Sequence, residues 1–395
     1  MKVIDRKLKN GVKLRILNSE EFKSSKIIVK FNSGYLSESR EKNQIAHVLE
    51  HILCDLSNED RDWIARSGAE TNAQTWEEYT RYFIETLPEF FEKAVDLQLR
   101  AIENPKISDE SVKREISNVR SEFSNRRQTP LNKLYDIKME EIFPNTINDQ
   151  TALSSLDNIT LGDIRRHYDQ FYTTDNVRIL IFGNFSTEEI SRVIKRIENF
   201  ALPRGEEKTF PGIKISDKRG AKISKNEDKT HLMYIPYSAE IRSDPRLRAA
   251  WLLVRNFLMD FETGKIYREV RDNGLLYSIY LGLNLDQNSL PNFEFSFSAD
   301  SENFDKIIEI IEKWISFAKN AEFSDEEFER LRIISKNKIC MKLRKVELRV
   351  NWHVWNFLLF GGYGLEDLLA EFDKVTKDDF VKIVKIIFDN FKVEE

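Results

Sequence analysis

The order of expected strands and helices repeats halfway along the chain, and this repeat limits the possible fold more than any other feature. An extended apolar run at residues 26–31 has its counterpart at residues 230–235, beyond a segment rich in Pro and Gly at residues 201–220. Farther along each half, the helix-start signal Ser108-Asp109-Glu110 has its counterpart in Ser324-Asp325-Glu326. A repeat of this length indicates an internal duplication.

Each half of the chain mixes strands with runs of helices. This mixture predicts the α+β class, with a mostly antiparallel sheet covered by helices in each half. A chain of 395 residues is also too long for one ordinary hydrophobic core. We therefore expect two homologous tandem domains, at residues 1–200 and 221–395, joined by a linker at residues 201–220.

Charge and composition argue against several classes of protein. Lys and Arg number 61 against 66 Asp and Glu, a net charge of −5, so nucleic acid is not an expected partner. No apolar stretch is long enough to span a bilayer, so no membrane association is expected. Only two cysteines, Cys54 and Cys340, are present, which gives no disulfide framework. These features favour a cytoplasmic location.

A short stretch in the first half, His47-Val48-Leu49-Glu50-His51, predicts part of a metal site. On a helix, residues three and four apart share a face, so the two imidazoles and the carboxylate converge. Neutral imidazoles suit Zn²⁺, and a carboxylate beside them can act as general base for an attacking water. The order H-x-x-E-H is the inverzincin signature.

Glu115 and Glu122 are candidates for completing this site. They are separated by two helical turns, so both carboxylates face the same way. The same spacing is common on exposed helix faces, where glutamates are merely solvated. In the second copy, Leu331 and Lys338 stand at the corresponding positions. The fold itself therefore does not require carboxylates there, as expected for a site added to a scaffold.

These residues, with three further segments, resemble the pitrilysin and insulysin family of zinc metallopeptidases, which includes the mitochondrial processing peptidase. Residues 68–75 are similar to the Gly…Asn-Ala-x-Thr segment of that family, and residues 176–184 to the closing strand of its first domain. Residues 271–278 are similar to the second-domain segment that completes the active site. The resemblance covers nearly the whole chain, whose length is that of half-size members with one pair of domains.

The resemblance implies roles for the five residues already singled out. It implies one Zn²⁺ per chain, bound by His47, His51 and Glu122. It also implies that Glu50 is the general base and that Glu115 supports catalysis from outside the ligand set.

The resemblance further implies how a peptide substrate is held. Asn72 and Ala73 would belong to a strand that pairs with an extended peptide. From the second domain, Arg271 and Tyr277 would bind the substrate backbone and stabilise the charge that develops during reaction. The family pattern has one more residue between this arginine and this tyrosine, so Arg268 is the alternative arginine.

The expected function is that of a zinc-dependent endopeptidase for short or unfolded peptides, held as an added strand in an enclosed chamber. Half-size members of the family pair to form such a chamber. Because this chain carries both the zinc residues and the Arg/Tyr segment, a homodimer is expected. Two alternatives stay open, a non-catalytic scaffold or partner subunit of a peptidase-like complex, and a peptide-binding module with little turnover.

Overall fold

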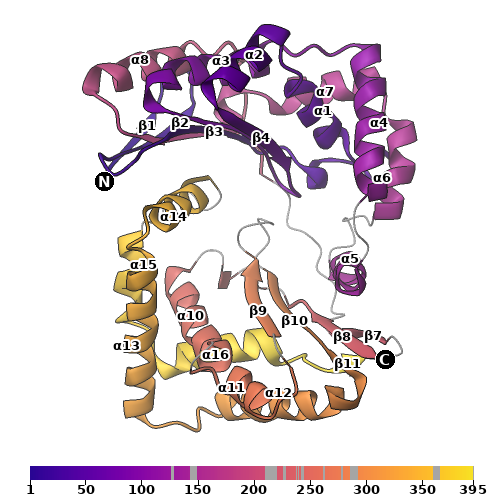
Figure 1. Ribbon diagram of the computed structural model, residues 1–395, viewed down its shortest axis with the longest axis vertical. Helices are drawn as coiled ribbons and strands as arrows, with labels where there is room; N and C mark the ends of the chain where they lie inside the picture. Colours follow the sequence, from indigo (N-terminus) through magenta and orange to yellow (C-terminus); the bar gives the residue numbers. More distant parts are fainter. Residues whose placement is uncertain are drawn as a thin grey trace. The chain divides into compact units, whose positions relative to one another are not determined.

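The computed structural model describes residues 1–125, 129–142, 149–209, 220–225, 228–236, 238, 240–241, 244–260, 263–276, 279–284, 292–358 and 365–394. The chain forms two compact units, each with its own sheet and helices (Figure 1). The first unit comprises Met1–Arg126, Asn145–Ile213 and Phe357–Gly361, and the second comprises Arg127–Pro144, Lys214–Asn356 and Gly362–Glu395. The predicted α+β class is confirmed.

The first unit is built on a six-stranded sheet with the order β1-β2-β6-β3-β5-β4. Its strands are β1 (Lys2–Lys7), β2 (Lys13–Asn18), β3 (Ser25–Phe31), β4 (Glu70–Thr75), β5 (Thr80–Thr86) and β6 (Val177–Gly183). The β2 and β6 strands are parallel, and the other neighbours are antiparallel. An Asn10-Gly11 turn joins β1 to β2, and Gly11 has a φ of 98°, which glycine adopts without strain.

Helices cover one face of this sheet (Figure 1). Helix α3 packs on β3 and β5, α1 packs on β4 and β5, and α4 and α7 pack against α1. The helices are α1 (Ile45–Leu53), α2 (Asn58–Ser67), α3 (Phe91–Glu103), α4 (Asp109–Asn125), α6 (Asp149–Ser155), α7 (Leu161–Phe171) and α8 (Thr187–Glu198).

The second unit is built on a five-stranded sheet with the order β11-β7-β8-β10-β9. Its strands are β7 (Ala221–Lys225), β8 (Lys229–Tyr234), β9 (Ile279–Asn284), β10 (Asn292–Asp300) and β11 (Val393–Glu394). Its helices are α5 (Pro130–Ile142), α10 (Pro245–Met259), α11 (Lys265–Asp272), α12 (Phe304–Lys319), α13 (Asp325–Lys342), most of α14 (Val346–Leu358), α15 (Leu365–Phe372) and α16 (Lys377–Phe388).

Helix α5 lies in the second unit, although the boundary expected at residue 200 puts its sequence in the first domain. It packs on β7 and β8. Within this contact, Lys138 is fully buried and its Nζ donates to Glu141 Oε2 at 2.9 Å, while Lys222 Nζ lies 3.4 Å from Glu141 Oε1. An amphipathic pattern shows that a helix buries one face, but it does not say against which sheet.

The buried apolar side chains form two separate clusters, one in each unit. In the first unit, the cluster joins the inner face of the sheet to α1, α3 and α7. Helix α1 is therefore fixed on the core along one side, and its other side is available for polar residues. Along the part of the chain that is described, no helix combines the length and the apolar character needed to cross a bilayer.

Candidate metal centre

Helix α1 presents His47, Glu50 and His51 from a rigid position. Its opposite face is apolar, and Val48 and Leu49 are completely buried. Because residues three and four apart share a helix face, the two imidazoles and the carboxylate project together. The apolar contacts with the core thus determine where these three polar side chains point.

The N-terminus of α1 is fixed by the side chain of Glu38, which precedes the helix. Its Oε2 accepts the backbone N–H of Gln44 at 2.6 Å, and its Oε1 accepts that of Ala46 at 2.5 Å. These N–H groups have no partner within the helix itself. The carboxyl group therefore satisfies them and holds the first turn of α1 in place.

Helix α4 brings Glu122 to the two histidines of α1. Glu122 Oε2 lies 3.4 Å from His47 Nε2, and Glu122 Oε1 lies 3.4 Å from His51 Nε2. Their ligand atoms all lie within 4.8 Å of one another. Among the residues that the structure describes, this is the only set of three His, Cys, Asp or Glu side chains close enough to hold one metal ion.

The donor atoms of His47, His51 and Glu122 fit a zinc ion. Two imidazole nitrogens and one carboxylate oxygen are ligands that zinc accepts, and three protein ligands leave a fourth position for water or substrate. A hydrogen bond with His47 lowers the pKa of Glu122, against the opposing effect of its partial burial. The carboxylate is therefore ionised at neutral pH, as a metal ligand must be.

Glu50 lies beside this set of ligands and is held by a different group of residues. Its Oε2 accepts a hydrogen bond of 2.6 Å from Thr75 Oγ1 on β4. Thr75 Oγ1 is 3.2 Å from Thr80 Oγ1, which in turn donates to the backbone carbonyl of Ser33 at 2.8 Å. Burial raises the pKa of Glu50, while the nearby His47 and the bond from Thr75 lower it. A buried carboxylate with a raised pKa suits a general base.

Glu115 contacts His51 on the side away from Glu122. Its Oε2 lies 3.4 Å from His51 Nδ1 and accepts from Asn118 Nδ2 at 2.7 Å. Its Oε1 accepts from Arg114 Nε at 2.7 Å, and Arg114 also donates through Nη2 to Asp55 Oδ2 at 2.6 Å. The carboxylate of Glu115 is thus buried but fully engaged, which makes its burial tolerable.

A cavity of about 490 Å³ adjoins these side chains. It is lined by His47, Glu50, His51, Cys54, Glu122 and residues 71–76. Residues 71–75 belong to β4, which is the last strand of the sheet. On this strand, the Ala73 N–H donates to the side chain of Asn72 at 2.8 Å. The cavity therefore lies between the metal-type residues and a strand at the edge of the sheet.

The predicted arginines of the second domain belong to the unit that does not carry this group. Arg271 and Arg268 are exposed on α11, in the second unit. Tyr277 lies outside the described residues. The roles of Arg271, Arg268 and Tyr277 at the active site stay predictions.

Sequence reasoning missed several side chains that hold the site. Thr75 lies within the Gly…Asn-Ala-x-Thr segment, and Asn118 is one helical turn from Glu115, so local sequence patterns could have indicated both residues. Asp55 and Arg114 are 59 residues apart, and no short pattern links them. Their contact follows from the packing of α1 against α4, which the sequence alone does not specify.

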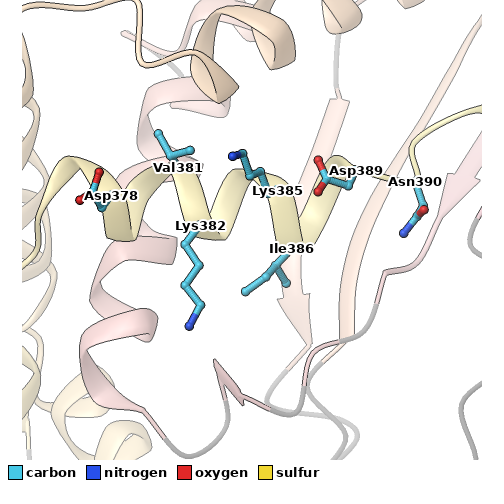
Figure 2. Close-up of a pocket in the computed structure, with 7 residues that line it drawn as sticks. All are labelled: Asp378, Val381, Lys382, Lys385, Ile386, Asp389 and Asn390. Carbon is cyan, nitrogen blue, oxygen red and sulfur yellow. The ribbon is translucent and has the colours of Figure 1, made fainter.

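A second hollow, along α16, has a different character. Figure 2 shows Asp378 and Asp389 toward opposite ends of the helix, with Lys382 and Lys385 between them. Asp389 Oδ1 is engaged by Lys319 Nζ at 3.0 Å. The two carboxylates do not converge, so this hollow offers no metal site comparable to that of the first unit.

Two imidazoles and a carboxylate that converge beside a buried glutamate are side chains of the kinds that bind zinc and activate water in metallopeptidases. Two family models agree with this. Residues 15–152 match the model described as Insulinase (Peptidase family M16), and residues 158–334 match the one described as Peptidase M16 inactive domain. The chain belongs to this insulinase-type family, as a half-size member.

Similar proteins and structures span nearly the whole chain. A protein of Bacillus subtilis named uncharacterized zinc protease YmxG is 23% identical over 96% of this chain and 94% of its own length. The crystal structure of a protease from Helicobacter pylori matches with a TM-score of 0.78 at 21% identity, over 99% of this chain and 98% of that one. A peptidase M16 inactive domain from Pseudomonas fluorescens matches with a TM-score of 0.81 at 17% identity, over 100% and 97% of the two chains. At these identities the structures establish the fold alone.

Proposed function

We propose that the protein is a zinc-dependent endopeptidase that hydrolyses short or unfolded peptides. The observation that carries this proposal is the convergence of His47, His51 and Glu122 beside Glu50, next to the edge strand β4. A zinc ion held by the two histidines and Glu122 would supply Lewis acidity that polarises the peptide carbonyl group.

Glu50 acts as general base and then as general acid. It takes a proton from the attacking water as the new carbon–oxygen bond forms, and it gives this proton to the amide nitrogen as the carbon–nitrogen bond breaks. Thr75 Oγ1 engages Glu50 Oε2, so Oε1 is the oxygen that exchanges the proton. Burial raises the pKa of Glu50, and this increases its readiness to accept the proton.

The substrate binds as an additional strand along β4. Main-chain hydrogen bonds to an edge strand require an extended peptide but no particular sequence. Asn72 accepts the Ala73 N–H in the free protein, so its side chain moves aside when a substrate carbonyl takes that N–H. Only flexible chains can adopt this conformation, which accounts for a preference for short or unfolded peptides.

Residues of the second domain and a second copy of the chain complete the proposed enzyme. Arg271, or Arg268 in its place, and Tyr277 bind the substrate backbone. A homodimer encloses the chamber, with one zinc ion per chain. Mass measurement in solution tests this, and a monomer that cleaves peptides at full rate would contradict it.

Cleavage of a quenched, unstructured peptide tests the proposed function. Zinc-loaded protein should cleave it, a chelator should stop the reaction, and added zinc should restore it. A stably folded protein of similar amino-acid composition should resist cleavage. If zinc-loaded protein cleaves nothing in a diverse peptide library, the enzyme proposal fails and the alternative of a non-catalytic scaffold or partner subunit is favoured.

A further inference from the structure

Gln44 has a backbone conformation that residues other than glycine rarely adopt. It stands at the N-cap of α1 with φ of 81° and ψ of 11°, and it is only 3% exposed. Among the described residues, Ala321 is the one other non-glycine residue with a positive φ. Such a conformation is costly, persists only where surrounding contacts enforce it, and is concentrated at functional sites.

The carboxamide of Gln44 belongs to a chain of hydrogen bonds that ends at His47. Asn43 Nδ2 donates to the backbone carbonyl of Tyr35 at 3.3 Å, and a carbonyl can only accept. Asn43 Oδ1 is therefore an acceptor, and Gln44 Nε2 donates to it at 2.7 Å. This leaves Gln44 Oε1, an acceptor, 3.1 Å from His47 Nδ1.

The direction of this chain determines the state of the His47 ring. Because Gln44 Oε1 cannot donate, His47 Nδ1 must carry the hydrogen. A metal ion would bind the lone pair of Nε2, which is the nitrogen that lies 3.4 Å from Glu122 Oε2, while Nδ1 keeps its hydrogen. His51 is arranged in the same way, with Nδ1 facing Glu115 and Nε2 facing Glu122.

We propose that Gln44 is a positioning residue that fixes the tautomer and the ring orientation of His47 for metal binding. Gln44 immediately precedes the first turn of α1, and its left-handed backbone brings its carboxamide within reach of the imidazole of His47. This inference rests on the proposed function of the site. Partners that orient metal-binding histidines affect metal affinity strongly without touching the metal.

Three substitutions at Gln44 separate the side chain from the backbone. Gln44→Leu keeps a side chain of similar size and removes the acceptor. Gln44→Glu keeps an acceptor at the same reach. Gln44→Gly removes the acceptor and also relieves the backbone. Ala321→Gly is the matched control, because it relieves the other positive φ, of 49°, and belongs to the second unit, whereas His47 belongs to the first.

Zinc affinity, thermal midpoint and ring tautomer are measured for each variant. Gln44→Leu and Gln44→Gly should bind zinc about ten- to a hundredfold more weakly, and Gln44→Glu should stay close to wild type. The metal-free Gln44→Gly and Ala321→Gly proteins should melt at or above the wild-type temperature. A residue that served only as the N-cap of α1 would not give a loss of zinc affinity without a loss of stability.

The tautomer of His47 is read in the metal-free protein by ¹⁵N spectroscopy of labelled histidines. The chain has five histidines, and His47→Gln assigns the relevant signals. Wild type and Gln44→Glu should carry a hydrogen on Nδ1, and Gln44→Leu should shift towards the Nε2–H form, because Glu122 still accepts from Nε2. A Gln44→Leu protein with the wild-type tautomer and wild-type zinc affinity would overturn the inference.

Failure of the inference is distinguishable from failure of the proposed function. If His51→Ala binds zinc as tightly as wild type, zinc does not bind at this site and the proposed function fails. The tautomer measurement needs no metal, so it still decides whether Gln44 orients His47. If zinc binding depends on His51 but not on Gln44, only the inference is wrong.

Discussion

Helices α4 and α13 occupy corresponding places in the two halves of the duplicated chain, yet only α4 takes part in the candidate metal centre. Both begin after a serine whose Oγ accepts the backbone N–H of the residue three positions later. This N···O distance is 3.1 Å for Ser108 and 3.1 Å for Ser324. The arginine that follows is also present in both, as Arg114 and Arg330. The start of the helix is thus common to both copies.

The two helices differ at the positions of Glu115 and Glu122. Glu115 of α4 is buried and bonded to Arg114, whereas Leu331 of α13 packs against the apolar core of the second unit. Glu122 approaches both histidines, whereas its counterpart Lys338 pairs with Asp260. In the second copy, the corresponding helix therefore has a structural role only. The difference indicates which residues of α4 serve the site rather than the fold.

Arg114 and Arg330 show the same contrast in their contacts. Arg114 links Asp55 to Glu115, which touches His51. Arg330 makes an exposed pair with Glu326, one turn away on its own helix. An exposed pair of this kind contributes little to stability. The shared position in the repeat therefore has two different roles, and substitution can tell them apart.

The largest expected effect is on the chemical step. Glu50→Gln should lower kcat for peptide cleavage by about 10²- to 10⁴-fold, because the amide cannot accept the proton. Zinc content should stay unchanged, since Glu50 is not part of the ligand set. Rate assays with metal analysis check this. Wild-type rates in the Glu50→Gln variant would show that another group is the base.

The next effect concerns metal binding and compares the two copies directly. Glu122→Gln should weaken zinc binding by more than about a hundredfold. Loss of a side chain that only orients a metal ligand already weakens metal binding by up to about a hundredfold, and Glu122 would bind the metal itself. Lys338→Gln, at the equivalent position, should leave zinc affinity unchanged. Competition with a chromophoric chelator measures both. Equal losses in the two variants would mean that the effect comes from disturbing the fold.

A smaller effect is expected from the paired arginines. Arg114→Gln should weaken zinc binding by about tenfold, because Glu115 loses the donor that holds its Oε1 beside His51. Arg330→Gln should change neither zinc affinity nor activity. The visible spectrum of the cobalt-substituted protein reports on ligand geometry and should shift only in Arg114→Gln. Identical spectra would remove Arg114 from the site.

The smallest effect at neutral pH concerns stability and separates two histidines outside the metal centre. Burial lowers the pKa of His167 to about 3, so between that value and the unfolded value near 6.5 the unfolded chain binds one more proton. The free energy of unfolding should therefore fall by about 1.4 kcal/mol per pH unit as the pH drops through this window. His167→Gln should remove this contribution.

His231 provides the control for that measurement, because it lies on β8 of the second unit and contacts Ser298 Oγ at 2.7 Å. His231→Gln should leave the His167 contribution in place. Denaturant unfolding at several pH values gives the slopes. A slope unchanged by His167→Gln would show that its imidazole is already protonated in the folded protein.

Much of the fold could be predicted from the sequence, because many of its helices, strands and turns depend on local sequence patterns. Helix α7 and strand β6 follow from periodicity and β-branched residues, and the Asn10-Gly11 turn from its dipeptide. The helix α5 lies in the second unit rather than the first, because amphipathicity does not identify the partner sheet. Packing between elements distant in sequence decided this point.

The candidate site divides in the same way. His47, Glu50 and His51 share a helix face, so their convergence could be predicted from spacing. The left-handed backbone at Gln44 could not, since most sequence patterns reserve that conformation for glycine. The residues that hold the metal-type side chains in place are therefore harder to predict than those side chains themselves.

Zinc analysis of the purified protein and its His51→Ala variant tests the central claim most directly. We expect one zinc ion per wild-type chain and none at this affinity in the variant, since only the first copy carries the ligand set. Two ions per chain, or one ion retained after His51→Ala, would contradict the account.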